Sequence, residues 1–352
     1  MMVSTELRQR AYIAGIEYHV PAGSLSNEQL ASQFPEWSIE KIEAKTGIRK
    51  RHIAAAGECA SDLAVEAAQK LLANYPHFRE KIDFLLLCTQ SPDYFLPATA
   101  CVVQDRLGLS RHIGAIDINQ GCSGFVYGLS LAKGLVETGQ ARAVLLVTAE
   151  TYSKYINPLD KSVRTLFGDA AAATLVAGAM SNEEMLGPFV FGTDGSGAGK
   201  LIVPDGGCRN PHGVKAAPEI ADDSGNVRSS ANLYMDGPSI LQFTLSTVPK
   251  LVSELQARSG SAADSLNYYV FHQANKFMLE SLRRKIGISP EKFIEFYADV
   301  GNTVSCTIPI ALAEASRSGK FKSGDRIMLV GFGVGLSWAG CMARWGSPAA
   351  GP

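Results

Sequence analysis

The chain carries the stretch Asp-Ile-Asn-Gln-Gly-Cys-Ser-Gly-Phe at residues 117–125, and its architecture can be worked out from there. The apolar run at 113–118 predicts a short buried strand, and the leucine spacing from Val126 onward predicts a helix that stops at Gly139. Cys122 therefore stands at a strand-to-helix junction, in the first turn of the helix, between glycines that permit a tight turn. Because the partial positive charge of a helix N-terminus stabilises a thiolate, we expect Cys122 to have a lowered pKa and to act as a nucleophile. The alternative is a small core cysteine, the ordinary environment of a free cysteine.

The composition is that of an ordinary globular protein. The 352 residues are 46% hydrophobic and 19% charged, and a formal net charge of −1 favours neither nucleic acid nor a membrane surface as a partner. The N-terminus lacks the apolar region of a signal peptide, and no apolar run reaches the ~18 residues that a membrane span needs. The seven cysteines contain no Cys-x-x-Cys pair, which indicates neither a disulfide framework nor a metal site. We therefore expect a soluble, cytoplasmic protein without a bound metal.

The second part of the chain repeats the pattern of the first part at a shift of about 180 residues. The strand predicted at 84–88 matches a strand predicted at 268–271, and at the same shift Cys122 falls on Asn302. We therefore predict a gene-duplicated α/β protein in which each half is a sheet flanked by helices. The two predicted halves are residues 1–182, which carry the cysteine, and residues 183–352.

Apolar periodicity and capping residues define the remaining elements. Residues 204–232 are rich in Gly, Asp, Asn and Ser and predict a mobile loop that interrupts the repeat. Further strands are predicted at 11–19, 143–147 and 327–330, and helices at 26–34, 37–45, 61–72, 99–107 and 277–285.

Three polar residues follow predicted buried strands. They are Cys122, His272 after Tyr-Tyr-Val-Phe, and Asn302 in Val-Gly-Asn-Thr. Ligands of open α/β sheets gather at the carboxyl ends of strands, so two pseudo-symmetric halves could bring the three side chains together. The alternative for His272 is a satisfied core histidine. Together the residues suit acyl transfer through a thioester, in which the amide of Cys122 and the glycine-rich loop 331–337 serve one oxyanion and the imidazole and carboxamide serve a second, such as an enolate.

The chain resembles β-ketoacyl-acyl carrier protein synthase III over nearly its whole length. The motifs that carry the resemblance are Gly121-Cys-Ser-Gly-Phe125, Phe271-His-Gln-Ala-Asn275, Gly301-Asn-Thr303, Thr46-Gly-Ile-Arg-Lys-Arg-His52 and Gly331-Phe-Gly-Val-Gly-Leu-Ser-Trp338. The resemblance implies a thiolase-like fold with a five-layer αβαβα arrangement, and a homodimer. It also implies the condensation of an acyl-CoA primer with malonyl-acyl carrier protein, as in the initiation of fatty acid biosynthesis, with no cofactor because acyl-CoA is a substrate.

The same resemblance implies roles for individual residues. Cys122 would take the acyl group, and His272 with Asn302 would promote malonyl decarboxylation. Gln273 and Asn275 would orient the histidine loop, and the backbone of Val334 with that of Cys122 would form the acyl-side oxyanion hole.

Departures from the family pattern concern the substrate contacts. The tryptophan that stacks on the CoA adenine aligns with Lys41 and the arginine on its other face with Lys154, while Trp37 lies one helical turn before Lys41. The phenylalanine that caps the acyl pocket across the dimer interface aligns with Leu96, which predicts a longer or bulkier primer than acetyl. Further substrate contacts are expected from Lys45 and Phe167. A basic patch for the carrier protein is expected from Lys276, Arg283, Arg284 and Lys285, although a solvated face is the commoner meaning of such a cluster.

Two other functions compete with this one. The first is an acyltransferase or condensing enzyme of a secondary-metabolite pathway on the same scaffold, using a longer or aromatic primer. The second is a scaffold or carrier-protein-binding subunit without chemistry. Retention of all three polar residues disfavours the scaffold, and the presence of His272 and Asn302 favours condensation over simple acyl transfer, which needs no enolate.

Overall fold

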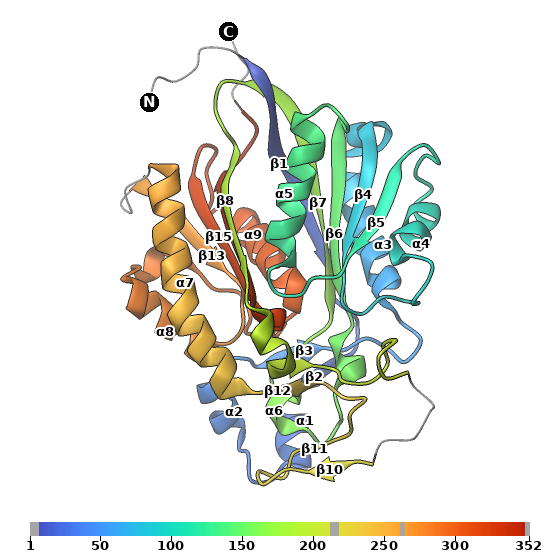
Figure 1. The fold of residues 1–352 in the computed structure, drawn as a ribbon, viewed down its shortest axis with the longest axis vertical. Helices are drawn as coiled ribbons and strands as arrows, with labels where there is room; N and C mark the ends of the chain where they lie inside the picture. Colours follow the sequence, from blue (N-terminus) through green and yellow to red (C-terminus); the bar gives the residue numbers. More distant parts are fainter. Residues whose placement is uncertain (1–6, 212–217, 261–264, 349–352) are drawn as a thin grey trace.

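The computed structural model describes residues 7–211, 218–260 and 265–348, and two five-stranded sheets organise them (Figure 1). The first sheet has the order β1-β7-β6-β4-β5, in which β4 runs parallel to β5 and β6, and β7 runs antiparallel to β6 and β1. Its strands are β1 (Arg8–His19), β4 (Ile82–Cys88), β5 (Gly114–Ile118), β6 (Ala143–Glu150) and β7 (Ala170–Ser181).

The second sheet has the order β14-β13-β15-β16-β8, with β13 parallel to β14 and β15. Its strands are β8 (Leu186–Thr193), β13 (Tyr268–Phe271), β14 (Phe293–Ile294), β15 (Arg326–Gly333) and β16 (Ser337–Arg344). The strands of the two sheets thus come from separate parts of the chain, and the division into duplicated halves at residue 182 stays a prediction.

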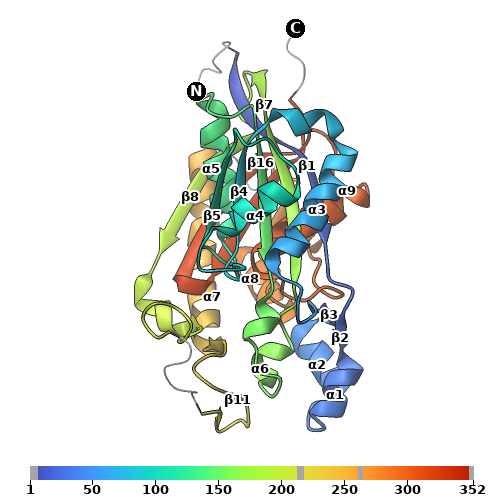
Figure 2. The same ribbon diagram turned by 90° about the vertical axis from the view of Figure 1, so that its right-hand side faces the viewer.

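Helices fill three layers around the sheets, which confirms the predicted αβαβα arrangement (Figures 1 and 2). The central layer contacts strands of both sheets, and each outer layer covers the far face of one sheet. The central helices are α5 (Gly124–Glu137) and α9 (Thr307–Arg317); α3 (Ala60–Asn74) and α4 (Thr99–Arg106) cover the first sheet, and α7 (Gly237–Ser259) and α8 (Lys276–Ile286) cover the second.

The central position of α5 follows from its composition. Phe125, Val126 and Leu129 are fully buried, and Gly128 lets the helix approach β6, because a Cβ atom there would come 2.5 Å from Cδ1 of Leu146. All eight residues of β6 are buried, as expected for a strand covered on both faces.

The predicted burial of the strand at 113–118 is wrong. The structure has β5 as an edge strand that pairs with β4 alone, and the Ile116 side chain is 45% exposed. An apolar run therefore marked a strand correctly but did not distinguish an interior strand from an edge strand.

The smaller elements gather at the end of the molecule that lies at the bottom of Figure 1. Trp37 precedes its helix, because Ser38 is the N-cap, and the predicted helix at 26–34 has a capping box between Ser26 and Gln29. The elements at this end are β2 (Ser24–Ser26), α1 (Asn27–Gln33), α2 (Ile39–Thr46), β3 (Lys50–His52), α6 (Lys161–Arg164), β10 (Ile220–Ala221), β11 (Val227–Arg228) and β12 (Tyr234–Met235). Short connecting elements are η1 (Pro76–Lys81), η2 (Tyr152–Tyr155), η3 (Gly195–Lys200), β9 (Leu201–Ile202), η5 (Pro290–Lys292), η6 (Val304–Cys306) and η7 (Val334–Leu336).

The expected loop at 204–232 contains regular structure. Strands β10 and β11 pair as an antiparallel hairpin, and Arg228 on β11 forms ion pairs with Asp160 at 2.7 Å and with Asp222 at 3.0 Å. The sequence did not predict this hairpin, because its strands are only two residues long and too short to show an apolar pattern within a polar segment. Residues 212–217 of the segment lie outside the described residues.

Candidate active site

Cys122 lies in the turn between β5 and α5, two residues before the helix begins, rather than in its first turn. The C-terminal end of β15, which contains Gly331 and Gly333, packs directly against this turn, so the first residues of the expected loop 331–337 are strand. A Cβ atom on Gly333 would come 2.7 Å from Sγ of Cys122, and a Cβ atom on Gly331 would come 2.7 Å from its carbonyl oxygen. Glycine at these two positions therefore permits the close approach that brings the backbone amide of Val334 to the sulfur.

The predicted lowering of the Cys122 pKa is wrong. Burial raises the pKa of the thiol to about 12, and the charge of Glu150 acts in the same direction. Hydrogen bonds from the amides of Val334 and of Cys122 itself lower the pKa, but by less. The thiol therefore rests in its protonated form, because the loss of water around it outweighs the helix terminus.

His272 lies at the end of β13, where its amide donates to the carbonyl of Val330 at 2.8 Å. Its Nδ1 atom is 2.7 Å from Oγ1 of Thr307, and its ring meets that of Phe332 edge to face at 5.6 Å. Burial lowers the pKa of His272 to about 3, so the imidazole is neutral at physiological pH. The Nε2 atom is the ring nitrogen that these contacts leave for the pocket.

The backbone of Asn302 joins the two sheet regions. Its amide donates to the carbonyl of Leu166 at 2.9 Å, and its carbonyl accepts from the amide of Gly168 at 3.0 Å. Its Oδ1 atom accepts from the amide of Val304 at 3.0 Å, which leaves the Nδ2 amino group as the donor. Val304 adopts a left-handed backbone with φ of 55°, a strained conformation for a β-branched residue.

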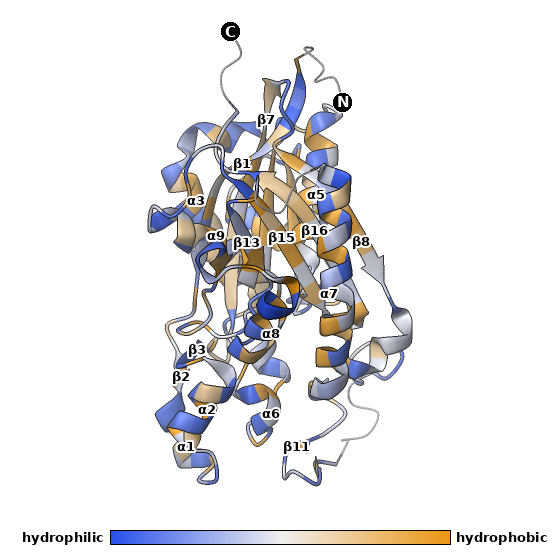
Figure 3. Ribbon diagram, turned by 90° about the vertical axis from the view of Figure 1, so that its left-hand side faces the viewer, coloured by the Kyte–Doolittle hydropathy of each residue, from blue (hydrophilic) through white to orange (hydrophobic). Residues whose placement is uncertain are grey.

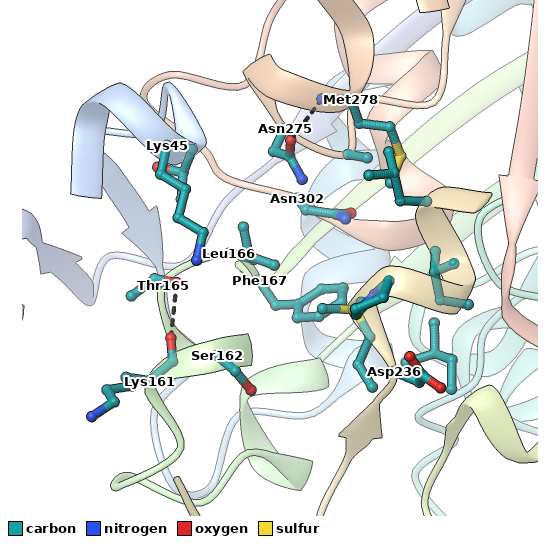
Figure 4. Close-up of a pocket in the computed structure, with 18 of the residues that line it drawn as sticks. Lys45, Lys161, Ser162, Thr165, Leu166, Phe167, Asp236, Asn275, Met278 and Asn302 are labelled. Carbon is teal, nitrogen blue, oxygen red and sulfur yellow. Dashed lines mark hydrogen bonds between the residues drawn. The ribbon is translucent and has the colours of Figure 1, made fainter. Parts of the chain in front are cut away.

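Cys122, His272 and Asn302 line one pocket of about 1110 Å³. Figure 4 shows part of its wall, including Asn302. The wall is mainly apolar and continues outward past Phe167 and Met278 to the hairpin β10–β11. Lys45, Lys161 and Trp37 also line the pocket, and Figure 4 shows the Lys45 side chain reaching in from α2. The structure therefore brings the three polar residues to one cavity.

Other residues expected at the substrate lie elsewhere. Leu96 is 83% exposed on the surface, next to the equally exposed Phe95. The Nζ atom of Lys154 is 2.8 Å from the carbonyl oxygen of Ala56, and the Nζ atom of Lys41 lies 5.4 Å from the Trp37 ring centre, so neither lysine lines the pocket.

Gln273 and Asn275 hold the loop after β13. Gln273 is fully buried, and its amide group donates to the carbonyl of Phe271 at 2.6 Å while accepting from the amide of Phe296 at 2.7 Å. Asn275 caps α8 by accepting from the amide of Met278 at 2.9 Å, and it also lines the pocket (Figure 4).

The four cations expected to meet the carrier protein lie on or beside α8 but differ in their partners. Arg284 forms an ion pair with Glu280 at 3.3 Å, and Arg283 donates to the carbonyl of Ile288. Lys276 and Lys285 are exposed. Figure 3 views the molecule from this side, and in it α8 carries both hydrophilic (blue) and hydrophobic (orange) residues, whereas strands β13, β15 and β16 are largely hydrophobic.

Sequence reasoning missed Glu150 and Thr307. Glu150 ends β6, is fully buried, and accepts from the amide of Gln90 and the hydroxyls of Ser91 and Ser305. Burial raises its pKa to about 8. Glu150 lies three residues beyond the strand predicted at 143–147, so only a looser form of the rule that selected His272, a polar residue near the end of an apolar strand, would have found it. No local signal marks Thr307.

The fold, together with a pocket that holds a cysteine, a histidine and an asparagine, is that of a thiolase-fold acyltransferase. Family models described as 3-oxoacyl-[acyl-carrier-protein] synthase III and its C-terminal part match residues 116–195 and 256–345. A β-ketoacyl-[acyl-carrier-protein] synthase III of Caldanaerobacter subterraneus is 36% identical over 335 residues, covering 95% of this chain and 98% of that protein. The chain belongs to the β-ketoacyl-acyl carrier protein synthase III family.

Solved structures agree with this assignment. A crystal structure of a 3-oxoacyl-(acyl-carrier-protein) synthase III superposes with a TM-score of 0.94 at 54% identity and covers 96% of this chain and all of that one. The priming β-ketosynthase of the R1128 polyketide biosynthetic pathway superposes with a TM-score of 0.82 at 29% identity, with 98% of each chain covered.

Proposed function

We propose that this protein loads an acyl group from acyl-CoA onto Cys122 and condenses it with malonyl-acyl carrier protein to a 3-oxoacyl product, in the initiation of fatty acid biosynthesis. The observation that carries the proposal is the meeting of Cys122, His272 and Asn302 in one apolar pocket. Membership of the synthase III family supports the same reaction.

In the first half-reaction the sulfur of Cys122 attacks the thioester carbon of acyl-CoA. The new C–S bond forms as the bond to the CoA sulfur breaks, and the thiol proton ends on CoA. The amide of Val334, which already points at Sγ, and the amide of Cys122 supply the oxyanion donors. The high thiol pKa keeps the cysteine uncharged until a thioester is bound.

In the second half-reaction the malonyl group loses carbon dioxide. The electron pair of the broken C–C bond passes into the thioester carbonyl, and the resulting enolate oxygen is stabilised by donors on His272 and Asn302. The enolate carbon then attacks the acyl carbon, and the Cys122 sulfur leaves and regains a proton. Neutral His272 suits this role, because burial disfavours its protonated form.

For substrate binding we assign Lys45, Trp37 and Phe167, which line the pocket between its mouth and Cys122. An ammonium group at Lys45 complements the phosphates of CoA and of phosphopantetheine. Lys41 and Lys154 do not line the pocket, and their contact with the CoA adenine stays a prediction. Gln273 and Asn275 support the His272 loop through their backbone contacts.

We further propose that the carrier protein docks on the exposed face of α8. Lys276 and Lys285 are its available cations, Arg284 offers a charge shared with Glu280, and the charge of Arg283 lies beside the C-terminus of its own helix. Phe277, 57% exposed and lining the pocket mouth, places an apolar contact between them.

A homodimer is supported by the open edge of the first sheet. Strand β5 has one unpaired side, Ile116 on it is exposed, and Tyr94, Phe95 and Leu96 are 62%, 81% and 83% exposed. An exposed apolar edge strand is a site for pairing with another chain. We propose that a second copy covers this edge, so that Leu96 caps the acyl pocket of its partner.

The site chemistry proposed here needs no cofactor beyond the acyl-CoA substrate, and we place the protein in the cytoplasm with its thioester substrates. No helix within residues 7–211, 218–260 and 265–348 is long and apolar enough to cross a membrane.

Intact-mass spectrometry after incubation with a panel of acyl-CoA primers tests the proposal. The wild type should gain one acyl group, Cys122→Ala none, and the matched buried-cysteine control Cys341→Ala one. His272→Ala and Asn302→Ala should acylate but lose malonyl decarboxylation by about 10²–10³-fold. Acylation of another cysteine in Cys122→Ala would refute the assignment. Preference for an aromatic or branched primer would favour the secondary-metabolite alternative.

A further inference from the structure

The surroundings of the His272 Nδ1 atom bear on which ring nitrogen carries the proton. Nδ1 is 2.7 Å from Oγ1 of Thr307, the first residue of α9, and both residues are about 2% exposed. The same Oγ1 atom is 2.9 Å from the carbonyl oxygen of Val304. Thr307 has a single hydroxyl proton, so it can donate to the ring nitrogen or to the carbonyl, but not to both.

The two choices give His272 opposite properties. If the hydroxyl donates to Val304, its oxygen accepts from Nδ1–H, and the neutral ring turns a bare Nε2 toward the pocket. If the hydroxyl donates to Nδ1, the ring proton sits on Nε2, which then acts as a hydrogen-bond donor. The first arrangement suits a base and the second an oxyanion.

One observation favours the second arrangement. The carbonyl of Val304 already accepts from the backbone amide of Thr307, so it has a partner without the hydroxyl. The two distances do not decide between the arrangements, because a 2.7 Å contact of oxygen to nitrogen is equally short whichever atom donates. The same carbonyl also lies within hydrogen-bonding reach of the His272 ring, so the competing Nδ1–H tautomer has an acceptor as well.

The strained turn at Val304 lies next to both candidate hydrogen-bond donors, the side chains of Asn302 and His272. Its amide holds Oδ1 of Asn302, which frees Nδ2, while its carbonyl faces the Thr307 side of His272. One turn between Asn302 and Thr307 thus sets the donor groups of both side chains.

We propose that Thr307 donates its hydroxyl proton to Nδ1 of His272 and holds the ring as the Nε2–H tautomer, which makes Thr307 a positioning residue for decarboxylation. The inference rests on the proposed function, because an enolate oxygen needs a donor and gains nothing from a bare nitrogen.

Nitrogen-15 NMR of histidine-labelled protein tests the tautomer without any substrate. The wild type and Thr307→Ser should show a protonated Nε2 and an unprotonated Nδ1. Thr307→Val should move the proton to Nδ1, which can then donate to the carbonyl of Val304. A matched control is Thr303→Val, because Thr303 is buried nearby and its hydroxyl has no hydrogen-bond partner in the part of the chain that the structure describes. A protonated Nδ1 in the wild type overturns the proposal, even if Thr307→Val does not fold.

The half-reactions provide the second readout. Thr307→Val should self-acylate from acyl-CoA as Thr303→Val does, while its release of labelled carbon dioxide from malonyl-acyl carrier protein falls by about 10²-fold. Thr307→Ser should restore that release. Equal losses in both half-reactions would show a merely structural role and overturn the proposal. Failure of the wild type to self-acylate would instead refute the proposed function and leave the tautomer measurement valid.

Discussion

At the scale of one residue, burial has more influence on the pKa of the Cys122 thiol than the nearby helix N-terminus has. Cys122 lies beside a helix N-terminus, which favours a thiolate, yet burial raises the pKa of the thiol to about 12. A desolvated anion costs more than a helix terminus contributes, typically about 0.3–1 kcal/mol. The reactivity of the free thiol should therefore keep increasing with pH well above neutrality, as the thiolate fraction rises.

The rate of Cys122 alkylation by a small haloacetamide should rise about tenfold per pH unit from roughly pH 7 to 10, without a plateau, because only the thiolate reacts. Peptide mass spectrometry after timed quenching measures the rate, and prior acylation should abolish it. A plateau near neutral pH would contradict the raised pKa and restore the expected helix effect.

A second prediction at the scale of one residue concerns the buried carboxyl of Glu150 and the pH dependence of stability. Burial raises its pKa from 4.5 to about 8, so the native state keeps a proton that the unfolded chain loses between these values. Its contribution to the free energy of unfolding therefore falls as pH rises through that window. Gln cannot lose a proton, so the free energy of unfolding of Glu150→Gln, taken relative to the wild type, should be higher at pH 8 than at pH 4.5. We expect this relative gain to be about 2–4 kcal/mol. Denaturant unfolding at both pH values checks this, with exposed Glu254→Gln, an ion-pair residue, as a control that should show no such pH dependence.

At the scale of elements, the site depends on the fit of the C-terminal end of β15 against the turn before α5. Gly331 has no room for a Cβ atom, which would come 2.7 Å from both the Cys122 carbonyl oxygen and the Ser123 Cα atom. Backbone atoms cannot move aside as a flexible side chain can, so any larger residue must push the two elements apart.

Gly331→Ala should therefore lower the rate of Cys122 acylation by about 10²-fold or more through displacement of the oxyanion donors. Gly199→Ala provides the control, since nothing lies within 4 Å of a Cβ atom at that position. Rapid-quench mass spectrometry gives both rates. Wild-type acylation in Gly331→Ala would mean that the end of β15 does not position the oxyanion hole.

Elements were also where sequence reasoning worked best and where its limits showed. The strands β4, β6, β13 and β15 followed from apolar runs, although β6 and β15 extend to Glu150 and Gly333, beyond their predicted ends at 147 and 330. The duplication that pairs Asn302 with Cys122 stays a prediction. Edge position is a property of pairing, so Ile116 could not be recognised as exposed. Thr307 gains its importance from a contact across 35 residues, which no local pattern encodes.

At the scale of the whole molecule, the exposed segment containing Leu96 connects primer choice to assembly. A leucine cap contributed by a second copy would leave more room than a phenylalanine ring, and each buried methylene of a longer primer contributes about 0.8 kcal/mol. The wild type should then prefer medium-length, branched or aromatic primers over acetyl-CoA.

Leu96→Phe should shift that preference toward short primers while acylation by acetyl-CoA persists. Competition between primers, read as the mass of the acylated protein, measures the shift. Leu255→Met, a substitution at a fully buried position of α7 on the other sheet, serves as the control. An unchanged chain-length profile in Leu96→Phe would show that the cap lies elsewhere.

The burial of Cys122 also bears on how the protein withstands oxidants. Peroxides attack thiolates, and oxidation beyond the sulfenic acid is irreversible for most cysteines. A sulfur that stays protonated and shielded from water between turnovers offers such reagents almost nothing to attack, and during turnover the acyl group covers it. The desolvation that makes Cys122 a slow nucleophile at rest therefore protects it from oxidative damage.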